Sequence, residues 1–407
     1  LPEERDYAAV RKAQKWLAGI LEEWEQGGKQ GPCPVPDEPL PFMSGTFNVP
    51  LYGINNWGDL FNTRQKVTMT LLARLIQNTQ GNVQRGLACV LNKLADKQST
   101  LCGWKVTAEY MGTHTFSRPA LPIIWDYCEA NPLCESSGSI SQEIDWVLKV
   151  LQIWPGVNST AQKTCGAMIQ LADATKHPLP NMTAAIWFTD PPYYNAIPYA
   201  DLSDFFYVWL KRSLSRYPLL QNPKDSLNNL TPKAGELCEM AGWDSDRYAI
   251  KDRRFYENGM CSAFSEGRRV LVDQGIGSVV FAHKTTEGWE ALLTGLIRGG
   301  WTITGSWPIA TEMGARLRAR DSAALATSVH LVCRPRPEDA PVGDWSDVLR
   351  ELPERVGNWV EYLQEQGIRG ADLIFACIGP ALEIFSRYSR VETAAGDEVK
   401  LDEYLEK

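Results

Sequence analysis

Alternating strand-like and helical patterns between Cys165 and Arg334 restrict this chain to a small set of folds. Short apolar runs predict strands, and apolar residues that recur every three to four positions predict helices. The predicted strands are 167–171, 184–189, 278–282, 301–307 and 328–334, and the predicted helices are 202–214, 255–274 and 288–298. This order predicts an α/β fold whose parallel sheet is closed by an antiparallel edge.

Predicted helices also lie on both sides of this region, at 6–26, 58–78, 140–153, 345–366 and 371–388. Residues 112–140 are expected to be irregular, except for a short helix at 125–129. A chain of 407 residues is long enough for two or three domains. We therefore predict a mainly helical region at 1–160, an α/β region at 161–336 and an acidic helical region at 337–407.

The acidic charge of the chain is concentrated at one end. The formal net charge is −8, and residues 336–407 contain sixteen acidic against eight basic side chains, so the preceding residues are formally neutral. A neutral body can still carry basic patches that contact phosphates. Charge therefore neither supports nor excludes binding to nucleic acid.

Cysteine usage and the absence of long apolar runs indicate a cytoplasmic protein that makes no contact with a membrane. No run approaches the roughly 20 apolar residues of a membrane-spanning helix, and residues 1–5 do not resemble a signal peptide. The ten cysteines form no Cys-x-x-Cys pair, so we expect reduced thiols and no metal. Cys128 and Cys134, the closest pair, are the alternative metal ligands. Because the chain begins with Leu1 and not with Met, we also expect that it is a fragment of a longer protein.

The segment Asp190-Pro191-Pro192-Tyr193 follows a predicted strand and carries the clearest chemical signal. Open α/β sheets bind their ligands at the carboxyl ends of parallel strands. Two successive prolines hold the backbone extended and remove two N–H donors. A carboxylate, free carbonyls and an aromatic ring then suit a planar molecule with an amino group. The alternative is a stiff turn after a core strand.

This segment resembles the Asp-Pro-Pro-Tyr motif of the amino-group DNA methyltransferases. More narrowly, the chain is similar to adenine-specific DNA methylases that carry a zinc ribbon and the DUF1156 region. The resemblance extends from about residue 50 to 390, and it is carried by residues 56–61, 190–194, 199–206, 283–286, 311–312 and 316–319. It implies a Rossmann-like methyltransferase sheet that lacks its first strands, with residues 1–160 as a target-recognition or insertion region.

The resemblance implies methyl transfer from S-adenosylmethionine to the exocyclic amino group of a base flipped out of double-stranded DNA. By position, Asp190 and the Pro191 carbonyl would accept hydrogen bonds from that amino group. Tyr193 would stack on the base, and Pro192 completes the catalytic motif. Asp173 and Ala174 resemble the segment that borders the cofactor, although Asp173 could instead cap a turn.

Further substrate-binding candidates lie near the same predicted sheet edge: Tyr194, Asn195 and Tyr199 after the motif, His283 and Lys284 after the next strand, and Arg316 and Arg318 in a loop that could grip phosphate. Each has an ordinary structural alternative, such as a core aromatic, a strand-end histidine or a solvated charged loop. The glycine-rich loop that cradles the cofactor in the resembling family is missing. We therefore expect another polypeptide, or a removed segment, to supply the side of the active site that binds the cofactor.

Three other interpretations of the function stay open. Cytosine N4 methylation would use the same oxygen-lined pocket, and transfer to an RNA or protein amide is more distant. The third is a noncatalytic nucleic-acid-binding or assembly subunit, which the missing glycine loop favours and the intact motif disfavours.

Overall fold

The computed structural model describes residues 3–105, 112–158, 168–214, 230–283, 285–309, 328–368, 370, 373 and 376–405. Contacts within the chain define two compact units, which we treat separately: Leu1–Ala167 with Tyr199–Glu236, and Met168–Pro198 with Leu237–Lys407. The predicted boundaries at 160 and 336 differ from this division. Residues 199–236 group with the N-terminal helices, and the acidic C-terminal residues group with the sheet.

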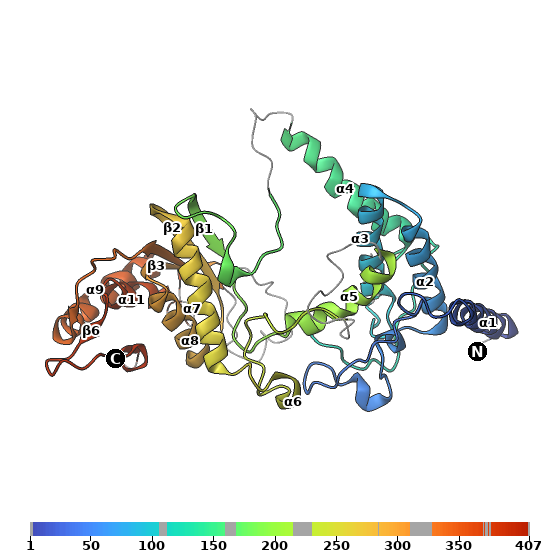
Figure 1. Ribbon diagram of the computed structural model, residues 1–407, viewed down its shortest axis with the longest axis horizontal. Helices are drawn as coiled ribbons and strands as arrows, with labels where there is room; N and C mark the ends of the chain where they lie inside the picture. Colours follow the sequence, from blue (N-terminus) through green and yellow to red (C-terminus); the bar gives the residue numbers. More distant parts are fainter. Residues whose placement is uncertain are drawn as a thin grey trace. The chain divides into compact units, whose positions relative to one another are not determined.

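Helices dominate the first unit (Figure 1). The predicted helix 58–78 is divided, because Asn62 starts a new helix. The Asn62 side chain accepts a hydrogen bond from the Gln65 N–H at 3.0 Å, and the Gln65 side chain accepts one from the Asn62 N–H at 2.8 Å. This capping box fixes the helix start. The helices are α1 (Glu4–Gln26), α2 (Thr63–Gln77), α3 (Gly81–Gln98), α4 (Ile140–Asn158) and α5 (Tyr199–Ser213), with 3-10 turns η1 (Val49–Tyr52) and η2 (Trp57–Leu60).

Aromatic side chains of α5 enter the core of the first unit. Phe205 stacks on Phe61 with 5.7 Å between ring centroids, and Trp209 meets Phe61 edge to face at 5.3 Å. The predicted short helix at 125–129 is wrong. There the Cys128 N–H donates to the Cys102 carbonyl at 2.6 Å, so the backbone pairs across the chain and not along a helical turn. Helix α3 was not predicted.

The second unit contains a four-stranded sheet of order β1-β2-β4-β3, built from β1 (Ala184–Thr189), β2 (Leu271–Phe281), β3 (Trp301–Ile309) and β4 (Ser328–Pro335). β1 is parallel to β2, and β4 is antiparallel to both β2 and β3. β1, β2 and β3 therefore run in the same direction. The sheet does end in an antiparallel pair, β4 with β3, but the reversed strand β4 lies inside the sheet and β3 forms the edge.

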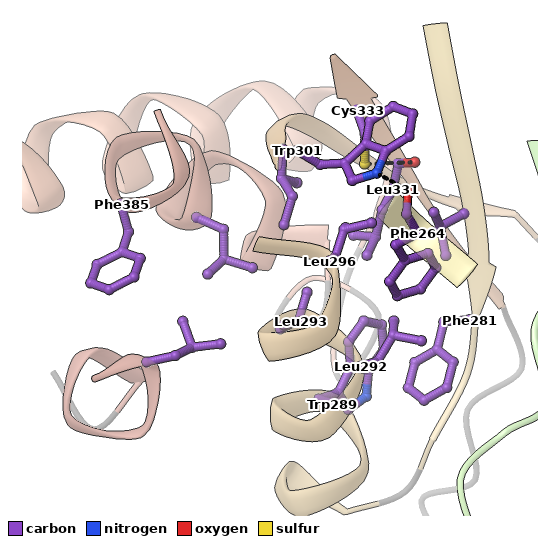
Figure 2. Packing of buried hydrophobic residues seen from close by; sticks show 14 of the residues in the cluster. Phe264, Phe281, Trp289, Leu292, Leu293, Leu296, Trp301, Leu331, Cys333 and Phe385 are labelled. Atoms are coloured by element: carbon purple, nitrogen blue, oxygen red, sulfur yellow. Dashed lines mark hydrogen bonds between the residues drawn. The ribbon is translucent and has the colours of Figure 1, made fainter. Parts of the chain in front are cut away.

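Helices α7 (Arg253–Val270) and α8 (Thr286–Arg298) cover one face of this sheet (Figure 1). Figure 2 shows the α8 side chains Trp289 and Leu292 beside Phe281 of β2. Trp301 lies in the same core, and its Nε1–H donates to the Phe264 carbonyl of α7 at 2.9 Å. The predicted helix 255–274 ends earlier, at Val270, because β2 begins at the next residue and pairs there with β1.

The second unit also contains η3 (Ala174–Lys176), α6 (Ser245–Tyr248), β5 (Gly343–Asp344), α9 (Trp345–Glu365), α11 (Ile378–Ser386), β6 (Val391–Glu392) and α12 (Leu401–Leu405). The predicted strand 167–171 is wrong in its described part. Residues 168–171 form no strand, and Met168, Ile169 and Leu171 are 92%, 99% and 83% exposed. None of the helices in the described ranges is both long and apolar enough to cross a bilayer.

Candidate functional site

The carboxyl ends of β1, β2 and β3 lie at one edge of the sheet, because the three strands run in the same direction. Asp190 directly follows β1, and His283 follows β2 by two residues. The structure therefore brings the motif and His283 to the edge where α/β sheets bind ligands. Arg316 and Arg318, which come after β3, lie outside the described residues, as does Lys284.

Asp190 and Pro191 present two acceptor groups, a carboxylate and a carbonyl, to which no described residue donates a hydrogen bond. The Asp190 side chain is exposed and forms no hydrogen bond or ion pair with the described part of the chain. Pro191 is buried, and its carbonyl likewise receives no hydrogen bond from the described residues. Most carbonyl oxygens in folded proteins are paired, so this oxygen, unpaired among the described residues, is suited to a donor that arrives with a ligand.

The Pro192 carbonyl differs, because residues of the fold donate hydrogen bonds to it. The Pro192 oxygen accepts one hydrogen bond from the Tyr194 N–H at 3.0 Å and another from the Tyr256 hydroxyl at 3.0 Å. Tyr256 belongs to α7 and is fully buried. Burial raises the pKa of Tyr256, so its hydroxyl stays protonated and donates.

The two tyrosines of the motif occupy different environments. Tyr193 is half-buried and meets the Phe281 ring edge to face at 5.4 Å between centroids. Tyr194 is only 3% exposed and adopts φ +49°, a left-handed conformation that is uncommon outside glycine. Its hydroxyl donates to Glu287 Oε1 at 3.0 Å. Burial and then Glu287 raise the pKa of Tyr194. Tyr194 therefore supports the motif from within the core, and its contact with the substrate stays a prediction.

His283 packs between aromatic rings under the same edge. Its ring stacks on Phe281 and meets Tyr194 edge to face, with centroids at 6.1 Å and 5.8 Å. The Thr285 N–H donates to His283 Nδ1 at 3.2 Å. A backbone N–H can only donate, so Nδ1 is an acceptor and a neutral His283 carries its proton on Nε2. This side chain is 8% exposed, and its contact with the substrate stays a prediction.

The predicted cofactor residues form a local turn. Asp173 Oδ1 accepts hydrogen bonds from the Thr175 N–H at 2.9 Å and the Thr175 hydroxyl at 2.7 Å, which caps η3. Asp173 and Ala174 are both exposed, and no strand precedes them within residues 168–172. Asp173 thus caps a turn, which was the alternative. Their contact with the cofactor stays a prediction.

Two other predicted substrate residues, Asn195 and Tyr199, lie in different units. Asn195 is half-buried and follows Tyr194 in the second unit. Tyr199 is 43% exposed and starts α5 in the first unit.

Three residues that the sequence analysis missed support the motif: Tyr256, Glu287 and Arg253. Arg253 Nε lies 2.7 Å from Glu257 and its Nη2 lies 2.9 Å from Glu290, while Nη1 is 3.7 Å from Glu287. The positive charge of this one guanidinium therefore partly compensates the negative charges of three carboxylates. No local sequence pattern marks these residues, because their role depends on how α7 and α8 pack.

The described residues do not by themselves fit S-adenosylmethionine. The glycines of Gly275-Ile276-Gly277 lie inside β2, and a Cβ on Gly277 would come within 2.6 Å of the Trp301 ring. These glycines permit close packing and do not form a loop after a strand. Asp173 is bonded within its own turn, and the described part of the second unit shows no glycine-rich loop after a strand.

Three cysteines of the first unit, Cys102, Cys128 and Cys134, line part of a cavity of about 220 Å³. Two of them, Cys128 and Cys134, are the alternative metal ligands of the sequence analysis. Burial raises the pKa of the Cys102 and Cys128 thiols. Within the described ranges, no three His, Cys, Asp or Glu side chains are grouped so that they could hold a metal ion.

Comparisons with known proteins give no identification. No protein-family model matches the chain, and neither the curated proteins nor the solved structures contain a match.

Proposed function

We propose that this chain forms the base-binding side of a DNA amino-methyltransferase, with adenine N6 as the expected acceptor. One observation carries the proposal. Asp190 and the Pro191 carbonyl have no described hydrogen-bond donor, whereas the adjacent Pro192 carbonyl is fully bonded within the fold. Two unoccupied acceptors beside the Tyr193 ring suit a planar base that carries an amino group.

These acceptors would act on the nitrogen of the base. An exocyclic amino group is a weak nucleophile, because its lone pair is shared with the ring. Hydrogen bonds to Asp190 and to the Pro191 carbonyl favour the form in which that lone pair is localised on nitrogen. In the transfer, the bond between the methyl carbon and the sulfur of the donor would break, and the sulfur would leave with the bonding electrons as a neutral thioether. The nitrogen would bond to the methyl carbon and release one proton, which the exposed Asp190 carboxylate could accept and pass to water. Positioning and charge stabilisation supply the rate.

The methyl donor, S-adenosylmethionine, requires a second component in this proposal. β1 is an edge strand of the described sheet and carries no charged residue. Its Ile186 and Phe188 side chains are 69% and 62% exposed. Natural edge strands are usually short, charged or covered. We therefore propose that another polypeptide segment covers this edge and supplies the donor site.

A noncatalytic nucleic-acid-binding subunit is the second candidate. The turn that occupies Asp173 and the packing role of Gly277 favour it. The two candidates differ in whether the chain contributes to methyl transfer.

The test is transfer of tritiated methyl from S-adenosylmethionine to DNA of mixed sequence, assayed with the full chain alone and with extract from its source as a supply of the second component. Asp190→Ala should lower transfer by roughly 100-fold or more, as when one preorganised polar group is removed from an active site. Asp273→Ala is the matched control, since Asp273 is also exposed but lies near the opposite end of β2. Absence of transfer in both assays would favour the noncatalytic candidate. Calorimetric titration with S-adenosylhomocysteine shows whether the chain alone holds the donor.

A further inference from the structure

The two prolines of the motif present adjacent carbonyls whose bonding differs. Neither proline nitrogen can donate a hydrogen bond, so at these two residues the main chain offers acceptors only. The Pro192 oxygen has two partners, the Tyr194 N–H and the Tyr256 hydroxyl, whereas the Pro191 oxygen has none among the described residues. A carbonyl oxygen has two lone pairs. The Pro192 carbonyl is therefore saturated.

Tyr256 holds its position through several independent contacts. It lies in the first turn of α7, whose start is fixed by Asp252, because the Asp252 side chain accepts a hydrogen bond from the Phe255 N–H at 2.8 Å. The Tyr256 ring is fully buried and meets Tyr194 edge to face at 5.1 Å. Its hydroxyl reaches the Pro192 oxygen across 64 positions of sequence.

We infer that Tyr256 is a positioning residue that selects which oxygens of the motif can receive the amino group of a base. Because Tyr256 occupies the Pro192 carbonyl and fixes its peptide plane, an incoming amino group can bond only with Asp190 and the Pro191 carbonyl. This inference rests on the proposed function and adds to it a residue on α7 that does not touch the substrate.

The experiment measures amino-group recognition without methyl transfer. Two single-stranded oligonucleotides of the same mixed sequence are compared by fluorescence anisotropy. One contains adenine, and the other contains purine, which lacks only the amino group, at each adenine position. Wild-type protein should bind the adenine strand roughly fivefold to tenfold more tightly, the value of one or two net hydrogen bonds. Tyr256→Phe should reduce this ratio at least threefold, because the peptide plane is no longer fixed.

Tyr404→Phe is the matched control. Tyr404 is 3% exposed, belongs to the same hydrophobic core and donates its hydroxyl to the Ala381 carbonyl. Both variants lose one buried hydroxyl, so a general loss of stability would weaken binding to both strands and leave their ratio unchanged. The Tyr404→Phe ratio should equal that of wild type.

The outcomes separate the two claims. A wild-type preference for adenine that survives in Tyr256→Phe overturns the positioning role and leaves the proposed function in place. A wild-type protein without any preference for adenine overturns both. Loss of the preference in Tyr256→Phe and also in Tyr404→Phe overturns the positioning role, since it assigns the effect to folding.

Discussion

The hydroxyl of Tyr194 donates a hydrogen bond to Oε1 of Glu287 at 3.0 Å. This bond ties the residue that follows the Asp-Pro-Pro-Tyr segment to the first turn of α8. Tyr194 also holds the left-handed φ of +49° and is buried against Tyr256 and His283. The end of the motif is thus anchored on two helices, while Asp190 and the Pro191 carbonyl are left with no donor from the described residues.

A double-mutant cycle measures this anchor. We expect Tyr194→Phe and Glu287→Ala each to lower the free energy of unfolding by about 1 kcal/mol, because each removes the same hydrogen bond. The double variant should lose less than the sum, with a coupling of about 0.5 kcal/mol or more in urea denaturation. Additive losses would show that the bond contributes nothing.

Gly288 allows α8 to approach His283. A Cβ at position 288 would lie 2.2 Å from His283 Nδ1, so Gly288→Ala should lower the free energy of unfolding by about 1–3 kcal/mol through overpacking. Gly357 is the control, because it lies inside α9 and a Cβ there would meet nothing within 4 Å. Gly357→Ala should raise stability by about 0.5–1 kcal/mol through helix propensity. Thermal unfolding of both variants would reveal the opposite signs, and equal signs would contradict the packing role.

The buried carboxylate of Glu38 should make stability depend on acid pH. Arg212 Nη1 lies 2.9 Å from Glu38 Oε1, and Lys211 also pairs with it. Burial raises the pKa of Glu38, but the attraction of Arg212 and Lys211 outweighs burial and holds this pKa below its ordinary value. The ion pair therefore stabilises the fold above the unfolded pKa of about 4.3 and loses this effect as pH falls through the lower, folded pKa.

Glu38→Gln should lower the free energy of unfolding by about 3 kcal/mol at neutral pH, because it leaves two cations poorly paired. Its melting temperature should then fall less than that of wild type between pH 6 and pH 3. Glu361→Gln, on the exposed face of α9, should retain the wild-type profile. A Glu38→Gln profile parallel to wild type would rule out this source of acid sensitivity.

The uncharged edge of β1 should promote association of the chain with itself. We expect Ile186→Lys to lower the associated fraction seen by sedimentation velocity, since a lysine on an edge strand opposes pairing. Val342→Lys replaces an apolar residue that is 44% exposed and lies outside β1, and it should leave the associated fraction unchanged. An equal effect of the two substitutions would point to net charge.

Part of the fold could be predicted from the sequence because it depends on local pattern. Helices α1, α5 and α8 and strands β1, β3 and β4 lie close to their predicted ranges. The position of Asp190 at the end of a strand could also be predicted. The exposed, irregular state of residues 168–171 could not, because an apolar run becomes a strand only where another strand pairs with it.

The sequence by itself determined helices α1, α5 and α8, strands β1, β3 and β4, and which oxygen-bearing residues follow β1. Only the tertiary structure decided that β4 lies between β2 and β3, and that Tyr256 and Glu287 hold the motif. These contacts join residues 64 and 93 positions apart. Periodicity describes only neighbours along the chain, whereas such contacts arise when distant elements pack around one core.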